Sequence, residues 1–232
     1  MTEAVRDPAS HPPAIDPEYR STLQRGPRMA PVLLPSTLSE RTGPAIVSVP
    51  TGSSDLTRNG RTNGAPLGER IIVTGRVTDD AGRPLPGELV EIWQCNSAGR
   101  YIHRDDRHDA PLDPNFLGAG RCVTDEDGCY RFLTIRPGAY PWGNHPNAWR
   151  PAHIHFSLFG PTIASRLVTQ MYFPGDPLLE FDPIFAAVPE AARDRLVSRF
   201  QRCITEEGYA LGYNFDIVLA GGGATPFEEG PE

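Results

Sequence analysis

Short apolar segments separated by turn residues dominate the chain from about Leu67 onward. Two turns stand out, at 79–82 and at 125–128, because both combine acidic residues with glycine just before or after a β-branched or alternating segment. Such segments between Gly, Pro, Asn and Asp turns are typical of strands. The sequence therefore predicts a mainly β fold. The segments that fit strands are 71–78, 88–93, 129–134, 152–158, 167–173 and 213–219.

One segment fits a helix instead. Pro189 and Glu190 form a helix start, and apolar residues recur at helical spacing from there to Gly208. We therefore expect a β-sandwich core with long loops, an extended N-terminal arm and one helix in the C-terminal half. The turn-rich pattern over 75–87 also occurs in sandwich modules without a catalytic role, so a scaffold or partner-binding subunit stays open. The recurring apolar residues are Leu196, Val197, Phe200, Cys203 and Ile204.

The first 66 residues have a different composition from the rest of the chain. They are rich in Pro, Ser, Thr, Gly and Arg, with scattered apolar residues such as Tyr19 and little periodicity. Segments of this kind are disordered or pack as an arm on another surface. We expect residues 1–66 to be an arm that packs on the core or on a partner subunit, and residues 67–232 to be one sandwich domain. The longest loop expected in that domain is 96–120.

The charge and the cysteines narrow the class of protein. A net charge of −7 and a pI near 5.4 argue against a nucleic acid or an anionic membrane as the main partner. No apolar run approaches the ~20 residues that cross a bilayer, and the N-terminus has no apolar signal core. The 4 cysteines show no CxxC pairing, which favours reduced thiols and a cytoplasmic location.

His153 and His155 are separated by one residue in a predicted strand. Successive side chains of a strand point to opposite faces, so the two imidazoles share a face, while Ile154 and Phe156 point the other way. Two imidazoles roughly 6–7 Å apart at Cβ can converge on one metal ion. A half-exposed strand with two polar histidines explains the same pattern, so His-X-His alone leaves both interpretations open.

Two tyrosines extend the candidate metal site. Tyr101 lies at the start of the long loop, and Tyr140 precedes His153 by a short segment. A site of two imidazoles and two phenolates is unusual for zinc but suits a hard trivalent ion such as ferric iron, which can replace the phenol proton. Each tyrosine taken singly is more commonly a packed aromatic. A zinc hydrolase built on the two histidines is less favoured, because no HExxH motif or third ligand is evident.

The chain resembles the intradiol ring-cleaving dioxygenases from residue 16 to residue 227. Catechol-cleaving members carry a helical N-terminal dimerisation domain, whereas this chain has a Pro-rich arm. It is therefore most similar to the beta subunits of the branch that cleaves protocatechuate. The segments that carry the resemblance are 68–73, 89–94, 110–116 and 149–156.

The resemblance implies a non-haem Fe(III) cofactor and the cleavage of protocatechuate (3,4-dihydroxybenzoate) by O2 to 3-carboxy-cis,cis-muconate, a step of aromatic catabolism in the beta-ketoadipate pathway. It implies a homologous alpha subunit without iron ligands, forming alpha-beta protomers within a larger oligomer. The implied metal ligands are Tyr101, Tyr140, His153 and His155. The implied catalytic residues are Tyr140, Arg150 and Gln170. The implied substrate-binding residues are Tyr19, Trp142, Arg150, Gln170 and Ile184.

Overall fold

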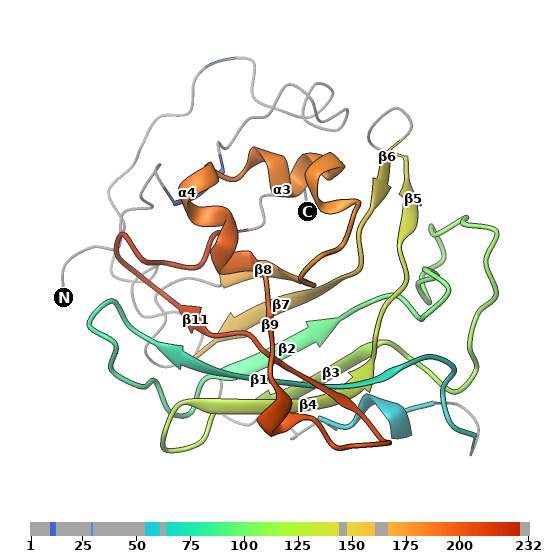
Figure 1. The fold of residues 1–232 in the computed structure, drawn as a ribbon, viewed down its shortest axis with the longest axis horizontal. Helices are drawn as coiled ribbons and strands as arrows, with labels where there is room; N and C mark the ends of the chain where they lie inside the picture. The colour runs from blue at the N-terminus through green and yellow to red at the C-terminus, as the bar shows by residue number, and fades with distance from the viewer. Residues whose placement is uncertain are drawn as a thin grey trace.

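A computed structural model of the chain describes residues 10–12, 29, 54–60, 64–143, 148–160 and 167–227. Strands make up most of its regular structure, in two larger sheets and one short ladder (Figure 1). The strands are β1 (Arg70–Thr78), β2 (Leu89–Trp93), β3 (Ala119–Val123), β4 (Cys129–Ile135), β5 (Tyr140–Trp142), β6 (Ala148–Arg150), β7 (His153–Phe159), β8 (Leu167–Tyr172), β9 (Arg199–Phe200), β10 (Leu211–Asn214) and β11 (Ile217–Val218). The helices are α3 (Pro183–Ala187) and α4 (Glu190–Arg193), with 3-10 turns η1 (Leu56–Arg58), η2 (Leu179–Phe181), η3 (Asp194–Leu196) and η4 (Arg202–Ile204).

The first sheet is built around β1. Strand β4 pairs antiparallel with one edge of β1, and β10 and β11 pair parallel with the other edge, with β9 antiparallel to β10. The predicted strand 213–219 is thus divided in two. The Asp216 carboxylate accepts a hydrogen bond from the Arg76 backbone N–H at 3.0 Å, so a side chain stands where the ladder would otherwise continue.

The second sheet has the antiparallel order β3-β2-β7-β8. Its register places His155 opposite both Trp93 of β2 and Gln170 of β8, and places His153 opposite Tyr172. Directly opposed residues share a face of the sheet. The register therefore brings these five side chains together on one side of it.

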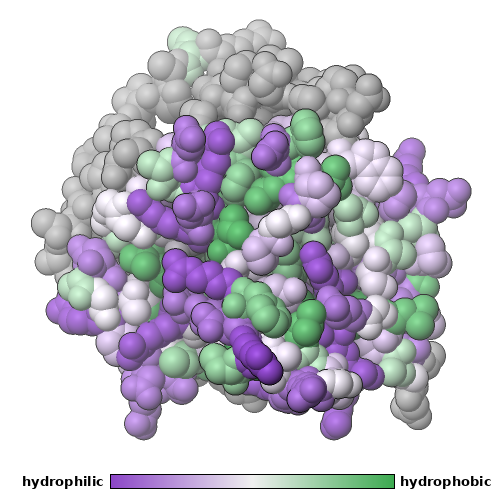
Figure 2. Space-filling view, viewed as in Figure 1, coloured by the Kyte–Doolittle hydropathy of each residue, from purple (hydrophilic) through white to green (hydrophobic). Residues whose placement is uncertain are grey.

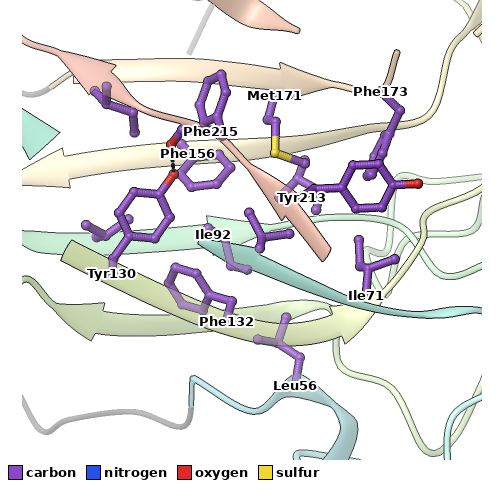
Figure 3. Close-up of a cluster of buried hydrophobic side chains, with 14 of the residues drawn as sticks. Leu56, Ile71, Ile92, Tyr130, Phe132, Phe156, Met171, Phe173, Tyr213 and Phe215 are labelled. Carbon is purple, nitrogen blue, oxygen red and sulfur yellow. Dashed lines mark hydrogen bonds between the residues drawn. The ribbon is translucent and has the colours of Figure 1, made fainter. Parts of the chain in front are cut away.

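The two sheets enclose one main hydrophobic core (Figure 3). Aromatic rings from both sheets meet there: the Phe156 ring centroid lies 5.2 Å from that of Phe215 and 5.8 Å from that of Tyr130. The Tyr130 hydroxyl donates to the Phe215 carbonyl oxygen, which satisfies both polar groups inside the core. The β-sandwich expected from the sequence is confirmed.

Strand β7 is buried on both faces, from His153 through Leu158. Ile154, Phe156 and Leu158 belong to the core between the sheets. The two histidines point away from that core, as the two-residue period predicts. The opposite face is therefore covered by other parts of the chain, and the candidate site lies under that cover.

The helix predicted over residues 189–208 is wrong in extent. Helix α4 ends at Arg193, and after η3 the chain becomes extended as β9. Ser198 explains the change, because its backbone N–H and its hydroxyl both donate to the Tyr172 carbonyl, at 2.9 and 2.8 Å. Pairing with β8 and β10 thus overrides the local apolar periodicity. The two short helices lie next to β8 (Figure 1), and α3 was not predicted from the sequence.

Two described stretches of the predicted arm contact the sandwich. Leu56 of η1 is fully buried in the core. Ser10 accepts a hydrogen bond from Arg195 at 3.1 Å, and the His11 ring lies edge-on to Phe227. The boundary at residue 66 stays a prediction. The residues that the structure describes contain no helix long and apolar enough to cross a membrane. All 4 cysteines are free. Polar and apolar residues are mixed over the face of the molecule shown in Figure 2.

Candidate metal centre

Four side chains from three separate parts of the chain converge beside β7. The Tyr140 hydroxyl lies 3.3 Å from His153 Nε2, and the Tyr101 hydroxyl lies 3.2 Å from His155 Nε2. The two imidazole centroids are 4.8 Å apart, and the two phenol centroids are 5.4 Å apart. All four residues implied as metal ligands are therefore in one place, with two nitrogens and two oxygens directed at each other.

The loop that carries Tyr101 is held at its base by Asn96. The Asn96 side-chain oxygen accepts from the backbone N–H groups of Ala98 and Arg100, both at 2.9 Å. The Asn96 carbonyl accepts from Gly138 N–H at 3.0 Å, so one buried residue joins this loop to the segment that leads into Tyr140. These contacts set the distance between the two tyrosines.

A glycine and an aspartate complete this local frame. Gly99 has φ +79°, and a Cβ there would lie 2.2 Å from the Ala139 carbonyl oxygen, so a side chain does not fit. The Asp106 carboxylate accepts from the Tyr101 N–H at 2.7 Å and lies 3.5 Å from the Arg100 guanidinium. Asp106 thus fixes the backbone of Tyr101 directly. Sequence reasoning gave Asn96, Gly99 and Asp106 no role.

His153 is held in the neutral form, which can donate a lone pair to a metal ion. Its Nδ1 lies 2.7 Å from the Pro151 carbonyl oxygen, so Nδ1 carries the proton and Nε2 presents its lone pair toward Tyr140. Burial, together with the positive charge of Arg150 and the neighbouring His155, holds the pKa of His153 well below its usual value. The uncharged imidazole is the form that binds metals.

The phenols need a cation to ionise here. Burial, and then the nearby Tyr140 oxygen, raise the pKa of Tyr101 well above its usual value. A phenolate at this position therefore requires a strong positive charge beside it, which a trivalent metal ion supplies. Among the described residues, no three His, Cys, Asp or Glu side chains form a metal-binding group. The donor set at this point, two imidazoles and two phenols, fits ferric iron by its chemistry.

The Trp93 ring packs against the imidazole of His155. The two rings are stacked with centroids 4.8 Å apart and planes inclined by 4°. The pair are register neighbours on β2 and β7, so the stacking follows from strand pairing. Sequence reasoning assigned no function to Trp93, since only the register reveals which strand lies beside the histidines.

Arg150 occupies the buried side of the site. Its side chain is 2% exposed, and its Nε and Nη2 lie 3.0 and 2.9 Å from the two carboxylate oxygens of Asp182, which is 0% exposed. Nη2 also contacts Gln170 Oε1 and, at 3.0 Å, the Tyr172 hydroxyl. The guanidinium carbon lies 5.7 Å from the Trp142 ring centroid. Three of the implied catalytic and substrate residues, Arg150, Gln170 and Trp142, thus form one cluster.

Asp182 and Tyr172 complete this cluster, and sequence reasoning missed both. Asp182 is the N-cap of α3, where its carboxylate accepts from the Ile184 N–H at 3.3 Å. The Tyr172 hydroxyl lies 2.9 Å from Asp182 Oδ2. The Asp-Pro start of α3 is a visible cap signal in the sequence, but nothing in it indicates the arginine partner. Ile184 is buried on α3, and Tyr19 lies outside the described residues.

Comparison with known proteins places the chain in a family. A family model described as Dioxygenase matches residues 41–221, and one described as Protocatechuate 3,4-dioxygenase beta subunit N terminal matches residues 4–37. The protocatechuate 3,4-dioxygenase beta chain of Burkholderia cepacia is 64% identical over 225 residues, which are 96% of each chain. The catechol 1,2-dioxygenase of Candida albicans is 33% identical over 67% of this chain and 53% of that one, so the chain spans about half of that relative.

Solved structures give the same assignment. Hydroxyquinol 1,2-dioxygenase from Pseudomonas putida is similar with a TM-score of 0.53 and 25% identity, over 82% of this chain and 68% of that chain. Catechol 1,2-dioxygenase from Acinetobacter is similar with a TM-score of 0.53 and 27% identity, over 74% and 58%. The chain therefore belongs to the intradiol ring-cleaving dioxygenase family, in its protocatechuate 3,4-dioxygenase beta-chain branch.

Proposed function

We propose that this chain is the catalytic subunit of an enzyme that cleaves protocatechuate between its two hydroxyl-bearing carbons, with O2, to give 3-carboxy-cis,cis-muconate. The observation that carries the proposal is the convergence of two phenol oxygens and two imidazole nitrogens at one partly buried point. The 64% identity to a protocatechuate 3,4-dioxygenase beta chain supports the choice of substrate. A non-catalytic scaffold does not explain why four potential metal donors meet there.

The residues that hold non-haem Fe(III) in this proposal are Tyr101, Tyr140, His153 and His155. Ferric iron, when bound, activates a chelated catechol toward dioxygen. The neutral His153 ring and the clamped backbone of Tyr101 suit two fixed ligands.

Tyr140 is the ligand best placed to move a proton. It begins the short strand β5, where it is the register partner of Arg150 on β6. In its phenolate form, the Tyr140 oxygen can accept one of the two protons that a catechol loses on binding. In that form, its negative charge and the positive charge of the Arg150 guanidinium attract each other. We therefore assign Tyr140 the role of general base for the substrate.

We assign Arg150 and Gln170 the role of hydrogen-bonding the oxygen atoms of the substrate and of dioxygen. Nε and Nη2 make every side-chain hydrogen bond that the described part of the chain gives Arg150, and we assign its Nη1 to an oxygen of a reactant. Gln170 uses its Oε1 on Arg150 and Tyr172, while its buried Nε2 has no hydrogen-bond partner among the described residues. A buried amide N–H without a partner is costly. A substrate or dioxygen oxygen at this position would satisfy it and stabilise developing negative charge.

The substrate ring is assigned to the apolar side chains beside this cluster, Trp142 and Ile184, with Tyr19 as a further substrate contact. We also assign the chain a homologous alpha partner without iron ligands, in alpha-beta protomers of a larger oligomer. The beta-chain name of the 64% identical relative supports a partner. Free thiols at all four cysteines, including exposed Cys129 and Cys203, support a cytoplasmic location.

Oxygen uptake by the chain co-expressed with its alpha partner tests the proposal. We expect protocatechuate to be consumed faster than catechol or hydroxyquinol, with one O2 taken up per product molecule and both oxygen atoms of labelled O2 in the product. The iron-loaded complex should be red-brown from phenolate-to-Fe(III) charge transfer, and Tyr140→Phe should weaken that colour. A colourless iron-loaded complex would refute the metal site. Faster turnover of catechol would refute only the substrate.

A further inference from the structure

Asp182 and Tyr172 form a buried polar frame around Arg150 that the proposed mechanism does not yet use. Asp182 Oδ1 accepts from Arg150 Nε and from the Ile184 N–H, and Oδ2 accepts from Arg150 Nη2 and contacts the Tyr172 hydroxyl. Two-point pairing of a carboxylate with a guanidinium fixes the guanidinium plane as well as its position. A single carboxylate thus sets the orientation of Arg150.

We propose that Asp182 is a positioning residue for the reaction: it locks Arg150, with Tyr172 as second support, so that Nη1 alone faces the reactants. The inference rests on the proposed function, because it assigns Arg150 a role in catalysis. An arginine side chain has many rotamers, and fixing it before the reaction removes an entropic cost from the chemical step. Asp182 acts on the chemical step through Arg150 and does not itself touch the reactants.

The same carboxylate also joins two parts of the site. As the N-cap of α3, Asp182 fixes the start of the helix that carries Ile184. The position of Arg150 and the position of that helix are therefore set by one residue, which is itself 0% exposed. The substitution Asp182→Asn removes a negative charge beside the metal ligands. It keeps a side-chain oxygen that can cap the N-terminus of α3.

A double-mutant cycle in the intact complex tests this inference. The proteins are wild type, Asp182→Asn, Arg150→Gln and the double variant. In Asp182→Asn, an amide N–H opposes Arg150 Nη2, so the two-point pairing is lost. We expect kcat for protocatechuate to fall by about tenfold to a hundredfold, with KM changed by less than about threefold. In the Arg150→Gln background, Asp182→Asn should lower kcat by no more than about twofold.

Stability gives a readout independent of turnover. Each single variant leaves one buried charge without its partner, whereas the double variant removes both charges. The double variant should therefore unfold at a higher temperature than either single variant. Asp55→Asn is the matched control, because Asp55 also caps a short helix with its carboxylate, at Thr57 N–H, on η1 beside β4. It should leave kcat unchanged.

The outcomes separate the two proposals. A wild-type complex that takes up no oxygen with protocatechuate overturns the proposed function, and this inference with it. An active wild type in which Asp182→Asn lowers kcat by the same factor in both backgrounds overturns only this inference. If Asp182→Asn does not assemble, Tyr172→Phe replaces it in the cycle. That variant keeps the ion pair, and the same test of equal factors applies to it.

Discussion

On the inner face of β7, Ile154, Phe156 and Leu158 pack against hydrocarbon from both sheets. On the outer face of the same strand, His153 and His155 meet tyrosine oxygens. Both faces are buried. They differ in chemistry, and the alternation of a strand separates them by one residue.

The difference shows how one strand can provide both stability and reactivity. Burial of hydrocarbon stabilises a fold roughly in proportion to area and needs no particular partner. Buried polar groups stabilise nothing unless each has a partner at the right distance. The outer face therefore depends on specific contacts, such as Pro151 for His153 and Trp93 for His155, and on a metal ion in the proposed function.

The largest expected effect on stability is at the centre of the inner face. Phe156→Ala should lower the free energy of unfolding by about 3–5 kcal/mol, because it leaves a cavity between two tightly placed rings. Urea unfolding of the metal-free chain measures this. Phe156→Leu keeps most of the volume and should lose less than about 2 kcal/mol. A loss below about 1 kcal/mol for the alanine variant would mean that this face relaxes around the cavity.

The next effect belongs to the outer face and should separate metal binding from stability. His155→Gln should reduce the affinity for ferric iron at least about a hundredfold, since even residues behind metal ligands contribute 10- to 100-fold. The free energy of unfolding without metal should fall by about 1–2 kcal/mol, less than for Phe156→Ala, because the stack on Trp93 is lost while a polar side chain remains. Iron competition with a chelator and urea unfolding measure the two quantities. His103→Gln, at an exposed imidazole, is the control. If His155→Gln kept its iron but lost as much stability as Phe156→Ala, the outer face would serve stability and not metal binding.

The strands could be predicted from the sequence because a two-residue period is a local property. It gave β1, β2, β4, β7 and β8 with nearly correct bounds. The helix predicted over 189–208 failed because its end depends on contacts that are not local. Ser198 bonds to the Tyr172 carbonyl, and β9 pairs with β10, so residues at helical spacing were drawn into extended structure.

The candidate site also has one part that local spacing predicts and another that it does not. The shared face of His153 and His155 follows from spacing alone. The position of Tyr101 beside Tyr140 follows from loop contacts through Asn96, which no spacing reveals, so the tyrosines depended on the family resemblance. Asp182 could not be predicted as a partner of Arg150, because the two approach only when α3 packs beside β8.

The third effect is a pH dependence of the outer face. The pKa of His153 in the folded chain lies well below its usual value, which is about 6.5 in an unfolded chain. Below pH ~6.5 the unfolded chain therefore binds a proton that the folded chain does not. The metal-free chain should lose up to about 1.4 kcal/mol of stability per pH unit as the pH falls from ~6.5 toward the folded pKa.

Urea unfolding at a series of pH values between 7 and 5 measures this slope. His153→Asn should have a shallower slope, because the group that takes up the proton is gone. His103→Asn removes a histidine from an exposed loop position and should keep the wild-type slope. Equal slopes for wild type and His153→Asn would show that the outer face accepts the charged imidazole, against the burial that separates it from solvent.

The smallest effect concerns the ring stacked on His155. Trp93→Phe keeps an aromatic ring against the imidazole but reduces the stacked area, so the free energy of unfolding should fall by about 0.5–1.5 kcal/mol. Iron affinity should fall by less than about tenfold, because strand register still orients the histidine. Trp149→Phe is the matched control, since that ring is 48% exposed and touches His108 only edge-on. If Trp93→Phe released iron as readily as His155→Gln, stacking would be what aims the imidazole, and strand register alone would not suffice to build the outer face.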